Sequence, residues 1–161
     1  MNIKYALHND DTAYAPVKAH AEDACYDLFA RSYARVTELG DDLNELRLHP
    51  GQRCLARTGV FLEMEPGWEA LVRPRSGNAL KLGLTVLNTP GTIDAGYRNE
   101  IGVILHNAGQ GTIDLAKGMK VAQIAFRAIP EHSLVGISKV DFNADTERSL
   151  NGFGSTGICK K

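Results

Sequence analysis

The sequence predicts an all-β fold with one short helix. Turn-forming pairs such as Pro50-Gly51 and Pro66-Gly67 recur along the chain, roughly every 8–16 residues. The segments between them are short, and they alternate apolar with polar residues far more often than they show a helical period. This spacing is typical of a β-sandwich or β-barrel.

Each expected element lies between turn signals. In the first half of the chain, strands are expected at residues 3–7, 46–48, 55–64 and 68–72. Residues 31–40 show no clear pattern, and residues 41–45 are acidic enough for a solvated loop. Ser76 introduces a short helix over residues 77–82. Strands follow at 84–88 and within 88–107, then at 120–128, and strand-forming residues continue to Val140.

Length and composition bound the class of protein. A chain of 161 residues predicts one domain. Its net charge of −1 provides no global field for nucleic acid or an anionic membrane, so neither partner is expected. The three cysteines have no paired spacing, which argues against a zinc site or disulfides. With a polar N-terminus and no apolar span, a soluble cytoplasmic protein is expected, or a nuclear one if the source is eukaryotic or viral.

The central stretch, residues 88–107, carries a carboxylate and an aromatic ring close together. Asp94 stands between Ile93 and Ala95 where a strand ends, and Tyr97 follows three residues later. Such a carboxylate can activate a water beside a ring-shaped substrate. The alternative is a hairpin whose Asp caps a turn and whose Tyr is half buried, and the local pattern alone favours that alternative.

Two further segments suggest a site for an anion and a cation. Arg75, Ser76 and Gly77 precede the expected helix, where free N–H groups, a hydroxyl and a guanidinium suit a phosphate. The alternative is a serine N-cap beside a surface arginine. Asp27, between Tyr26 and Leu28, can help to hold a divalent cation through waters, or it is a structural residue at a strand edge.

Polar residues in two later segments also have alternative interpretations. Gln123 within an apolar strand is either a core amide that bonds to backbone or a residue facing a site. The glycine-rich tail holds Phe153, which can stack on a base, and glycines that let backbone amides approach a phosphate. The alternative for the tail is an ordinary mobile terminus. His106 is interpreted as structural.

Together and in this order, five segments resemble the motifs of the trimeric dUTP pyrophosphatase (dUTPase) family. They read AEDACYDLFA, RPRSGNALKLGL, LNTPGTIDAGYRNEIGVILHN, KGMKVAQIAF and RSLNGFGSTG. The resemblance spans residues 21–157. It implies a jelly-roll-like β-barrel over residues 1–147 and a mobile tail over 148–161. It also implies a homotrimer in which each active site is built from all three subunits and closed by a tail.

The resemblance implies hydrolysis of dUTP to dUMP and pyrophosphate, which limits uracil incorporation into DNA and supplies dUMP. Asp94 would be the general base that activates a water for attack on the α-phosphorus. Tyr97 would lie against the deoxyribose and exclude a 2′-hydroxyl. The uracil edge would be read by Asn88 and by the backbone of the same hairpin, namely Gly91, Thr92 and Ile93.

The remaining roles implied by the resemblance concern the phosphates and the metal. Asp27 would lie near Mg²⁺ and contact it through waters. Phe153 would stack over the uracil. The phosphate chain would be held by Arg75, Ser76, Gly77 and Gln123, and its γ-phosphate by tail residues Arg148, Gly154, Ser155 and Thr156.

The chain departs from the family pattern where glycine is usual. Cys25 precedes the aromatic residue of the first motif, Asn99 follows Tyr-Arg in the third, and the fifth begins Arg148-Ser149-Leu150-Asn151. Asn tolerates positive φ better than most residues, whereas Ser149 and Leu150 bear on how tightly the tail closes. Residues 31–48 are long for the family, which predicts an insertion or an elongated hairpin.

Two alternatives to this function remain open. A dCTP deaminase is a structural relative of the family, but its deaminating glutamate aligns with Ile104, and Gly77 stands where deaminases commonly have a second serine. The other alternative is a dUTPase with an added regulatory role in binding a protein partner, for which residues 31–48 would be the natural location.

Overall fold

The computed structural model describes residues 3–9, 12–141, 143, 145 and 146. The chain divides into two units, Met1–Pro130 and Glu131–Lys161, and every helix and strand of the described residues belongs to the first. The predicted tail, residues 148–161, lies outside the described residues. A domain over residues 1–147 therefore stays a prediction.

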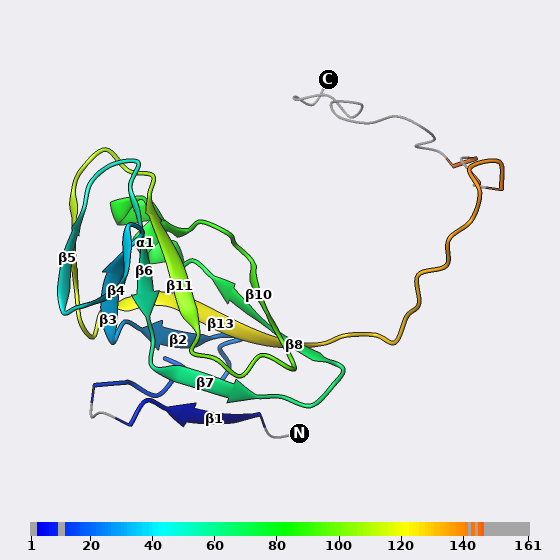
Figure 1. Cartoon of the computed structure of the whole chain (residues 1–161), viewed down its shortest axis with the longest axis horizontal. Helices are drawn as coiled ribbons and strands as arrows, with labels where there is room; N and C mark the ends of the chain where they lie inside the picture. The colour runs from blue at the N-terminus through cyan, green and yellow to red at the C-terminus, as the bar shows by residue number, and fades with distance from the viewer. Residues whose placement is uncertain (1–2, 10–11, 142, 144, 147–161) are drawn as a thin grey trace. The chain divides into compact units, whose positions relative to one another are not determined.

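The regular structure of the first unit consists of strands and one short helix, joined by turns and loops (Figure 1). The one helix of the described chain is α1, Ser76–Leu82. The strands are β1 Lys4–Leu7, β2 Tyr26–Phe29, β3 Ser32–Arg35, β4 Glu38–Leu43, β5 Glu45–Leu48, β6 Arg53–Arg57, β7 Val60–Glu63, β8 Trp68–Arg73, β9 Leu84–Val86, β10 Gly91–Asp94, β11 Gly102–Asn107, β12 Ile113–Ala116 and β13 Lys120–Ala128.

The strands form four sheets. The two larger ones have the orders β10-β8-β13-β2 and β4-β3-β6-β11-β9, and the pairs β1-β7 and β12-β5 form two-stranded sheets. Every strand pairing is antiparallel. Most neighbours are distant in sequence, so the order of the sheets depends on long-range contacts.

One hydrophobic core joins the two larger sheets. Leu28, Val72 and Ile124 come from the four-stranded sheet, and Val103 and Leu105 come from the five-stranded sheet; all five are buried in the same cluster. Alternation along β11 places its other residues on the opposite, exposed face. The result is two sheets packed over a shared apolar interior.

The expectation of an all-β fold with one short helix is confirmed, with two differences. The sheets of the described chain are not closed into a barrel, since the four-stranded sheet ends at the edge strands β10 and β2. No strand is formed by residues 129–141, although their sequence is apolar enough for one. Leu134 and Val140 are almost fully exposed there, so these two apolar side chains do not pack against the described residues.

The long segment between the first motif and β6 contains a hairpin, one of the two forms expected. The prediction of a loop at residues 41–45 is wrong, because β4 extends to Leu43 and β5 begins at Glu45. β3 pairs with β4, and β5 follows after one residue to pair with β12. No helix of the described residues combines the length and the apolar character that a membrane span requires.

Candidate active site

The residues predicted to hold the phosphate chain outside the tail, together with Asp27, line one pocket of about 330 Å³. Asp27 on β2 is the register partner of Gln123 on β13, and Gln123 is also the partner of Arg73 at the end of β8. The chain then continues from β8 into Arg75 and α1, so this row across the sheet brings the segments together. The pocket lining is Ala19, Asp23, Ala24, Cys25, Asp27, Arg75, Ser76, Gly77 and Gln123.

A carboxylate between two cations organises this pocket. Arg75 Nε donates to Asp27 Oδ1 at 2.8 Å, and Lys120 Nζ lies 2.9 Å from Asp27 Oδ2. The Asp27 side chain is only 12% exposed, so its partners compensate a charge held away from water. The contact uses Nε of Arg75 and directs the guanidinium, whose terminal nitrogens are further donors suited to phosphate oxygens.

Side-chain amides fix the backbone around the pocket. Gln123 Nε2 donates to the carbonyl of Pro74 at 2.9 Å, and Asn78 Nδ2 donates to the carbonyl of Lys120 at 2.9 Å. Gln123 is partly buried, bonds to backbone and also lines the pocket, so its role in a site stays a prediction. The serine N-cap alternative is wrong, because α1 begins at Ser76 and its N-cap residue is Arg75.

The second group of predicted residues lies at the other edge of the same sheet. β10 pairs with β8, with Gly91 opposite Val72 and Asp94 opposite Glu69. A Cβ on Gly91 would lie 3.3 Å from Nδ2 of Asn88, so the missing side chain lets the amide lie close over the strand. Thr92 is exposed, and Ile93 is partly buried against the core.

Asp94 and Tyr97 are joined by a tight turn at the end of β10. The Tyr97 N–H donates to the Asp94 carbonyl at 3.0 Å, while the Asp94 side chain is exposed. Tyr97 is 38% exposed, and its hydroxyl donates to the backbone carbonyl of Glu100 at 2.9 Å. The turn therefore presents a carboxylate and an aromatic ring together at the surface.

The two groups are well separated within one chain. Asp94 and Asp27 lie on the two edge strands of the four-stranded sheet, three strand spacings apart. Their register positions on β8, Glu69 and Arg73, are also four residues apart along the strand. Standard sheet dimensions convert these offsets into a separation of about 20 Å. The structure thus gathers the pocket residues around Asp27 in one place and the hairpin residues around Asp94 in another. Within one chain it does not bring the two sets together.

The other predicted residues divide between described and undescribed parts of the chain. Arg148, Phe153, Gly154, Ser155 and Thr156 lie outside the described residues. Ile104, which aligns with the deaminase glutamate, is an apolar, 36% exposed residue of β11.

The departures from glycine in the described chain have structural roles. The Oδ1 atom of Asn99 accepts the N–H of Glu100 at 2.8 Å, so this side chain contributes a turn contact that glycine would lack. Cys25 lines the phosphate pocket and is partly buried there.

A magnesium ion fits the pocket only with ligands from elsewhere. The described residues contain no group of three or more His, Cys, Asp or Glu side chains that could hold a metal. Both oxygens of Asp27 already face cations. Because Mg²⁺ prefers six oxygens and keeps several waters, it fits here as an ion that takes most of its ligands from phosphates and waters.

Sequence reasoning missed Lys120 and Asp23, which contribute charge to the pocket. Lys120 begins an apolar strand, and nothing local indicates that its ammonium reaches Asp27, more than ninety residues earlier. The register of β13 with β2 was the missing information.

Comparison with known proteins identifies the family of this chain. The family model described as dUTPase matches residues 11–157. A deoxyuridine 5′-triphosphate nucleotidohydrolase of Clostridium tetani is 44% identical over 96% of both chains. In fold, the chain resembles a mutant dUTPase of Staphylococcus bacteriophage 80alpha, solved with dUpNHpp. The two structures superpose with a TM-score of 0.80 and share 23% sequence identity. The match covers 98% of this chain and 99% of the other.

A second solved structure has a similar fold. It is a mutant dUTPase from phage phi11 of S. aureus, described with a structural Mg(II) ion, with a TM-score of 0.73 and 23% identity. It covers 88% of this chain and 100% of the other. The family match spans most of the sequence, and it includes every segment that carries a predicted site residue. The chain therefore belongs to the dUTPase family of nucleotide hydrolases.

Proposed function

We propose that this protein hydrolyses dUTP to dUMP and pyrophosphate, with Asp94 as the general base. The carrying observation is the exposed Asp94 carboxylate, held by the turn after β10 beside the Tyr97 ring. An exposed carboxylate at a fixed backbone position can accept a proton from a water that attacks the α-phosphorus. General-base catalysis of this kind contributes a factor of about 10²–10⁴.

The pocket at the start of α1 is the proposed site for the phosphate chain. Arg75 and the hydroxyl of Ser76 supply donors, Gly77 leaves the approach to the backbone open, and Gln123 keeps the Pro74 carbonyl in place. The Asp27–Arg75 contact at 2.8 Å directs the guanidinium before substrate arrives. Such preorganisation lowers the entropic cost of fixing the chain for in-line attack.

Magnesium is the proposed cofactor, held by substrate phosphates with Asp27 reached through waters. When bound, it would neutralise phosphate charge and hold the chain in one conformation. The residues of this chain then have two tasks, which are to orient the phosphates and to direct the attacking water.

The hairpin is the proposed nucleoside-reading element. Asn88 lies over Gly91, where its amide and the backbone of Thr92 and Ile93 can pair with the uracil edge. A site built for uracil leaves polar groups unpaired with cytosine, and this type of discrimination reaches about 10⁴. Tyr97 is the residue proposed to exclude a 2′-hydroxyl.

A homotrimer with shared sites is part of the proposal. The water activated by Asp94 must reach the same phosphate chain that Arg75 holds, yet within one chain the register separates Asp94 from the pocket around Asp27 by about 20 Å. The pocket of one copy and the hairpin of another would complete a site.

The tail completes the proposed site. Residues 148–161 would close over the nucleotide, with Phe153 on the base and with Arg148, Gly154, Ser155 and Thr156 on the γ-phosphate. A cytoplasmic location belongs to the same proposal, supported by the free thiols of Cys25 and Cys54. The activity would limit uracil incorporation into DNA.

Pyrophosphate release from dUTP, dCTP, dTTP and UTP with Mg²⁺ tests the substrate. We expect release from dUTP alone. Ammonia release or an equal rate with dCTP would instead support the deaminase alternative, which the apolar Ile104 disfavours.

The Asp94→Asn variant tests the general base. We expect kcat to fall about 10²–10⁴-fold with KM for dUTP near that of the parent, since the amide keeps the shape but accepts no proton. Asp114→Asn is the matched control, because Asp114 is also an exposed strand carboxylate but pairs with Arg47 on β5. Turnover by Asp94→Asn close to the parent rate would exclude Asp94 as the base.

A further inference from the structure

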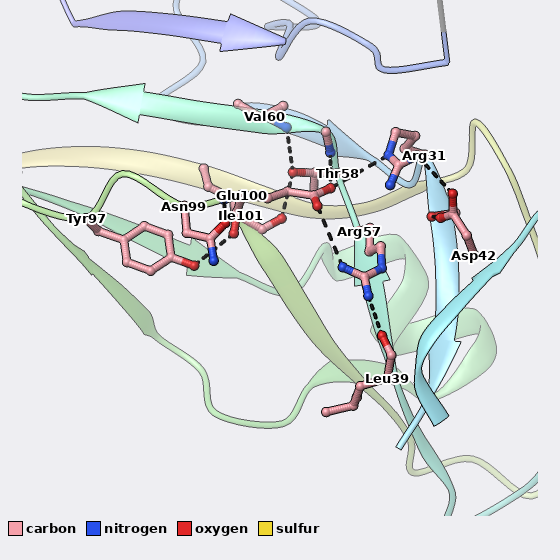
Figure 2. Close-up of polar contacts among 12 residues, drawn as sticks. Arg31, Leu39, Asp42, Arg57, Thr58, Val60, Tyr97, Asn99, Glu100 and Ile101 are labelled. Atoms are coloured by element: carbon pink, nitrogen blue, oxygen red, sulfur yellow. Dashed lines mark hydrogen bonds and ion pairs between the residues drawn. The ribbon is translucent and has the colours of Figure 1, made fainter. Parts of the chain in front are cut away.

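Glu100 is a largely but not fully buried carboxylate next to the proposed nucleoside-reading hairpin. Its side chain is 14% exposed, and Oε1 accepts the backbone N–H of Gly59 at 2.6 Å. Arg31 Nε lies 3.8 Å from one carboxylate oxygen and Arg57 Nη1 lies 3.8 Å from the other. Figure 2 shows Glu100 between these two arginines. A carboxylate held this far from water is costly unless such partners surround it.

The same short segment is fixed by its backbone. The N–H of Ile101 donates to the carbonyl of Val60 at 2.8 Å, and the hydroxyl of Thr58 donates to the carbonyl of Ile101 at 2.7 Å. Ile101 itself is fully buried. Residues 100 and 101 are therefore tied to the turn between β6 and β7 by both side-chain and backbone contacts.

Gly59 makes this connection specific to one backbone geometry. Its φ is +71°, and a Cβ there would lie 2.5 Å from Cβ of Ala13 and 3.1 Å from Cδ of Arg31. Only glycine both adopts this φ readily and leaves room for Ala13. The N–H that Glu100 accepts thus comes from a turn whose position is fixed by close packing.

The hydroxyl of Tyr97 is oriented by Glu100. It donates to the backbone carbonyl of Glu100 at 2.9 Å, across the loop that follows Asp94 (Figure 2). The ring is 38% exposed, so core packing alone does not hold it. Its direction depends on where the Glu100 backbone lies, and the contact of the Glu100 carboxylate with Gly59 is one of the contacts that fix this backbone.

We infer that Glu100 is a positioning residue for the nucleotide site, acting through Tyr97. Its carboxylate anchors the loop after β10 to the β6–β7 turn, and its carbonyl holds the Tyr97 hydroxyl. This inference rests on the proposed role of Tyr97 in excluding a 2′-hydroxyl. The expected consequence of losing the anchor is a looser fit around the sugar, and therefore weaker rejection of UTP.

The test is the ratio of kcat/KM for dUTP to kcat/KM for UTP on the full chain, with enough enzyme to measure UTP turnover that lies below detection in the substrate assay. This ratio does not depend on the fraction of active enzyme, so a loss of folded protein alone leaves it unchanged. We expect Glu100→Ala to lower the ratio about tenfold or more, the effect of losing one charge-assisted hydrogen bond. Glu100→Gln, whose amide oxygen can still accept the Gly59 N–H, should stay within about threefold of the parent.

Two further variants keep the test decisive. Tyr97→Phe removes only the hydroxyl, and it should lower the ratio about as much as Glu100→Ala does. In the double variant, Glu100→Ala should then lower the ratio little further. If Glu100→Ala fails to fold, Tyr97→Phe still tests the contact. Glu63→Ala is the matched control, because it deletes a carboxylate of an exposed ion pair with Lys4 and should leave the ratio unchanged.

The outcomes separate this inference from the proposed function. A parent enzyme with no preference for dUTP over UTP would overturn the proposed role of Tyr97. A parent with that preference, but with the ratio unchanged in Glu100→Ala or in Tyr97→Phe, would overturn the role of Glu100 and leave the proposed function intact.

Discussion

The thiols of Cys25 and Cys54 lie in different surroundings. Cys54 on β6 is 1% exposed, and burial raises the pKa of its thiol to about 12. Cys25 is partly buried and lines the pocket proposed for the phosphates. The thiolate is the reactive form, so Cys54 is protected both by its protonation and by its lack of access.

A thiol-specific alkylating reagent should therefore inhibit the enzyme through Cys25. An alkyl group there would occupy a pocket of about 330 Å³ beside Arg75 and Ser76. We expect inhibition of the parent, protection by dUTP, and resistance in Cys25→Ala. Peptide mapping by mass spectrometry should find Cys54 unmodified in the folded protein. Equal inhibition of Cys25→Ala would show that the reagent acts elsewhere.

For single residues, the sequence indicated candidate functional groups but not their partners. Asp94, Tyr97 and Asp27 became candidates through the five motifs taken together, because the local pattern alone favoured a structural role for each. Lys120 and Glu100 look like ordinary surface charges, and only strand pairing brings them to Asp27 and Gly59. A charge whose partner is forty or more residues away leaves no local pattern.

Among the elements, the β3–β4 hairpin is connected to the loop after β10 by a chain of charges. Asp42 on β4 accepts from the Ser32 hydroxyl and pairs with Arg31 Nη1 at 3.1 Å, and Arg31 in turn faces Glu100. The Ser32 hydrogen bond, aided by the Arg31 charge, lowers the pKa of Asp42 below its ordinary value although burial opposes this. The folded state thus favours the ionised carboxylate.

This lowered pKa predicts how Asp42 contributes to stability as pH changes. The contribution is fully present above the ordinary pKa of 3.8 and is lost as the pH falls through the lower folded value. We expect Asp42→Asn to reduce the free energy of unfolding at pH 7, with the difference from the parent shrinking below pH 3.8. Urea denaturation across this range measures it.

The Ser32→Ala change is the control for that prediction. It should destabilise the parent at pH 7, because the hydroxyl is the main cause of the lowered pKa of Asp42. In the Asp42→Asn background it should add no pH-dependent loss. A difference between parent and Asp42→Asn that is the same at both ends of the pH range would contradict the role assigned to the ionised carboxylate.

How well each element could be predicted depends on where its signal lies. β13 was predicted with its observed bounds, because a long apolar strand between turn residues is a local signal. β3 was missed, since its buried Ser32 and Tyr33 look unpatterned until β6 pairs with them. Residues 129–140 have strand-forming side chains but form no strand, because pairing requires a partner as well as propensity.

For the whole molecule, the proposed sharing of sites predicts complementation between damaged chains. Asp94→Asn damages the hairpin and keeps the pocket, whereas Arg75→Ala does the reverse. Each variant alone should be nearly inactive. Co-assembled at equal amounts, they should recover about a quarter of the parent activity. In random assembly, about half of the sites receive an intact hairpin, and about half of those also receive an intact pocket from another copy.

The control for complementation is a mixture of Asp94→Asn with Asp94→Asn,Arg75→Ala. No pairing of these chains contains an intact hairpin, so activity should stay at the level of Asp94→Asn alone. If the first mixture also stays inactive while size-exclusion chromatography shows mixed oligomers, both halves of a site would belong to the same chain.

β8 lies between β10 and β13, so one strand backs the hairpin on one side and the phosphate pocket on the other. In the proposed assembly, the hairpin and the pocket of a single copy serve two different sites. If a chain is damaged in both its hairpin and its pocket, the fraction of inactive sites in a mixed oligomer would therefore exceed the fraction of damaged chains. In genetic terms, such an allele would be dominant negative over an intact copy, whereas an allele that fails to fold would be recessive.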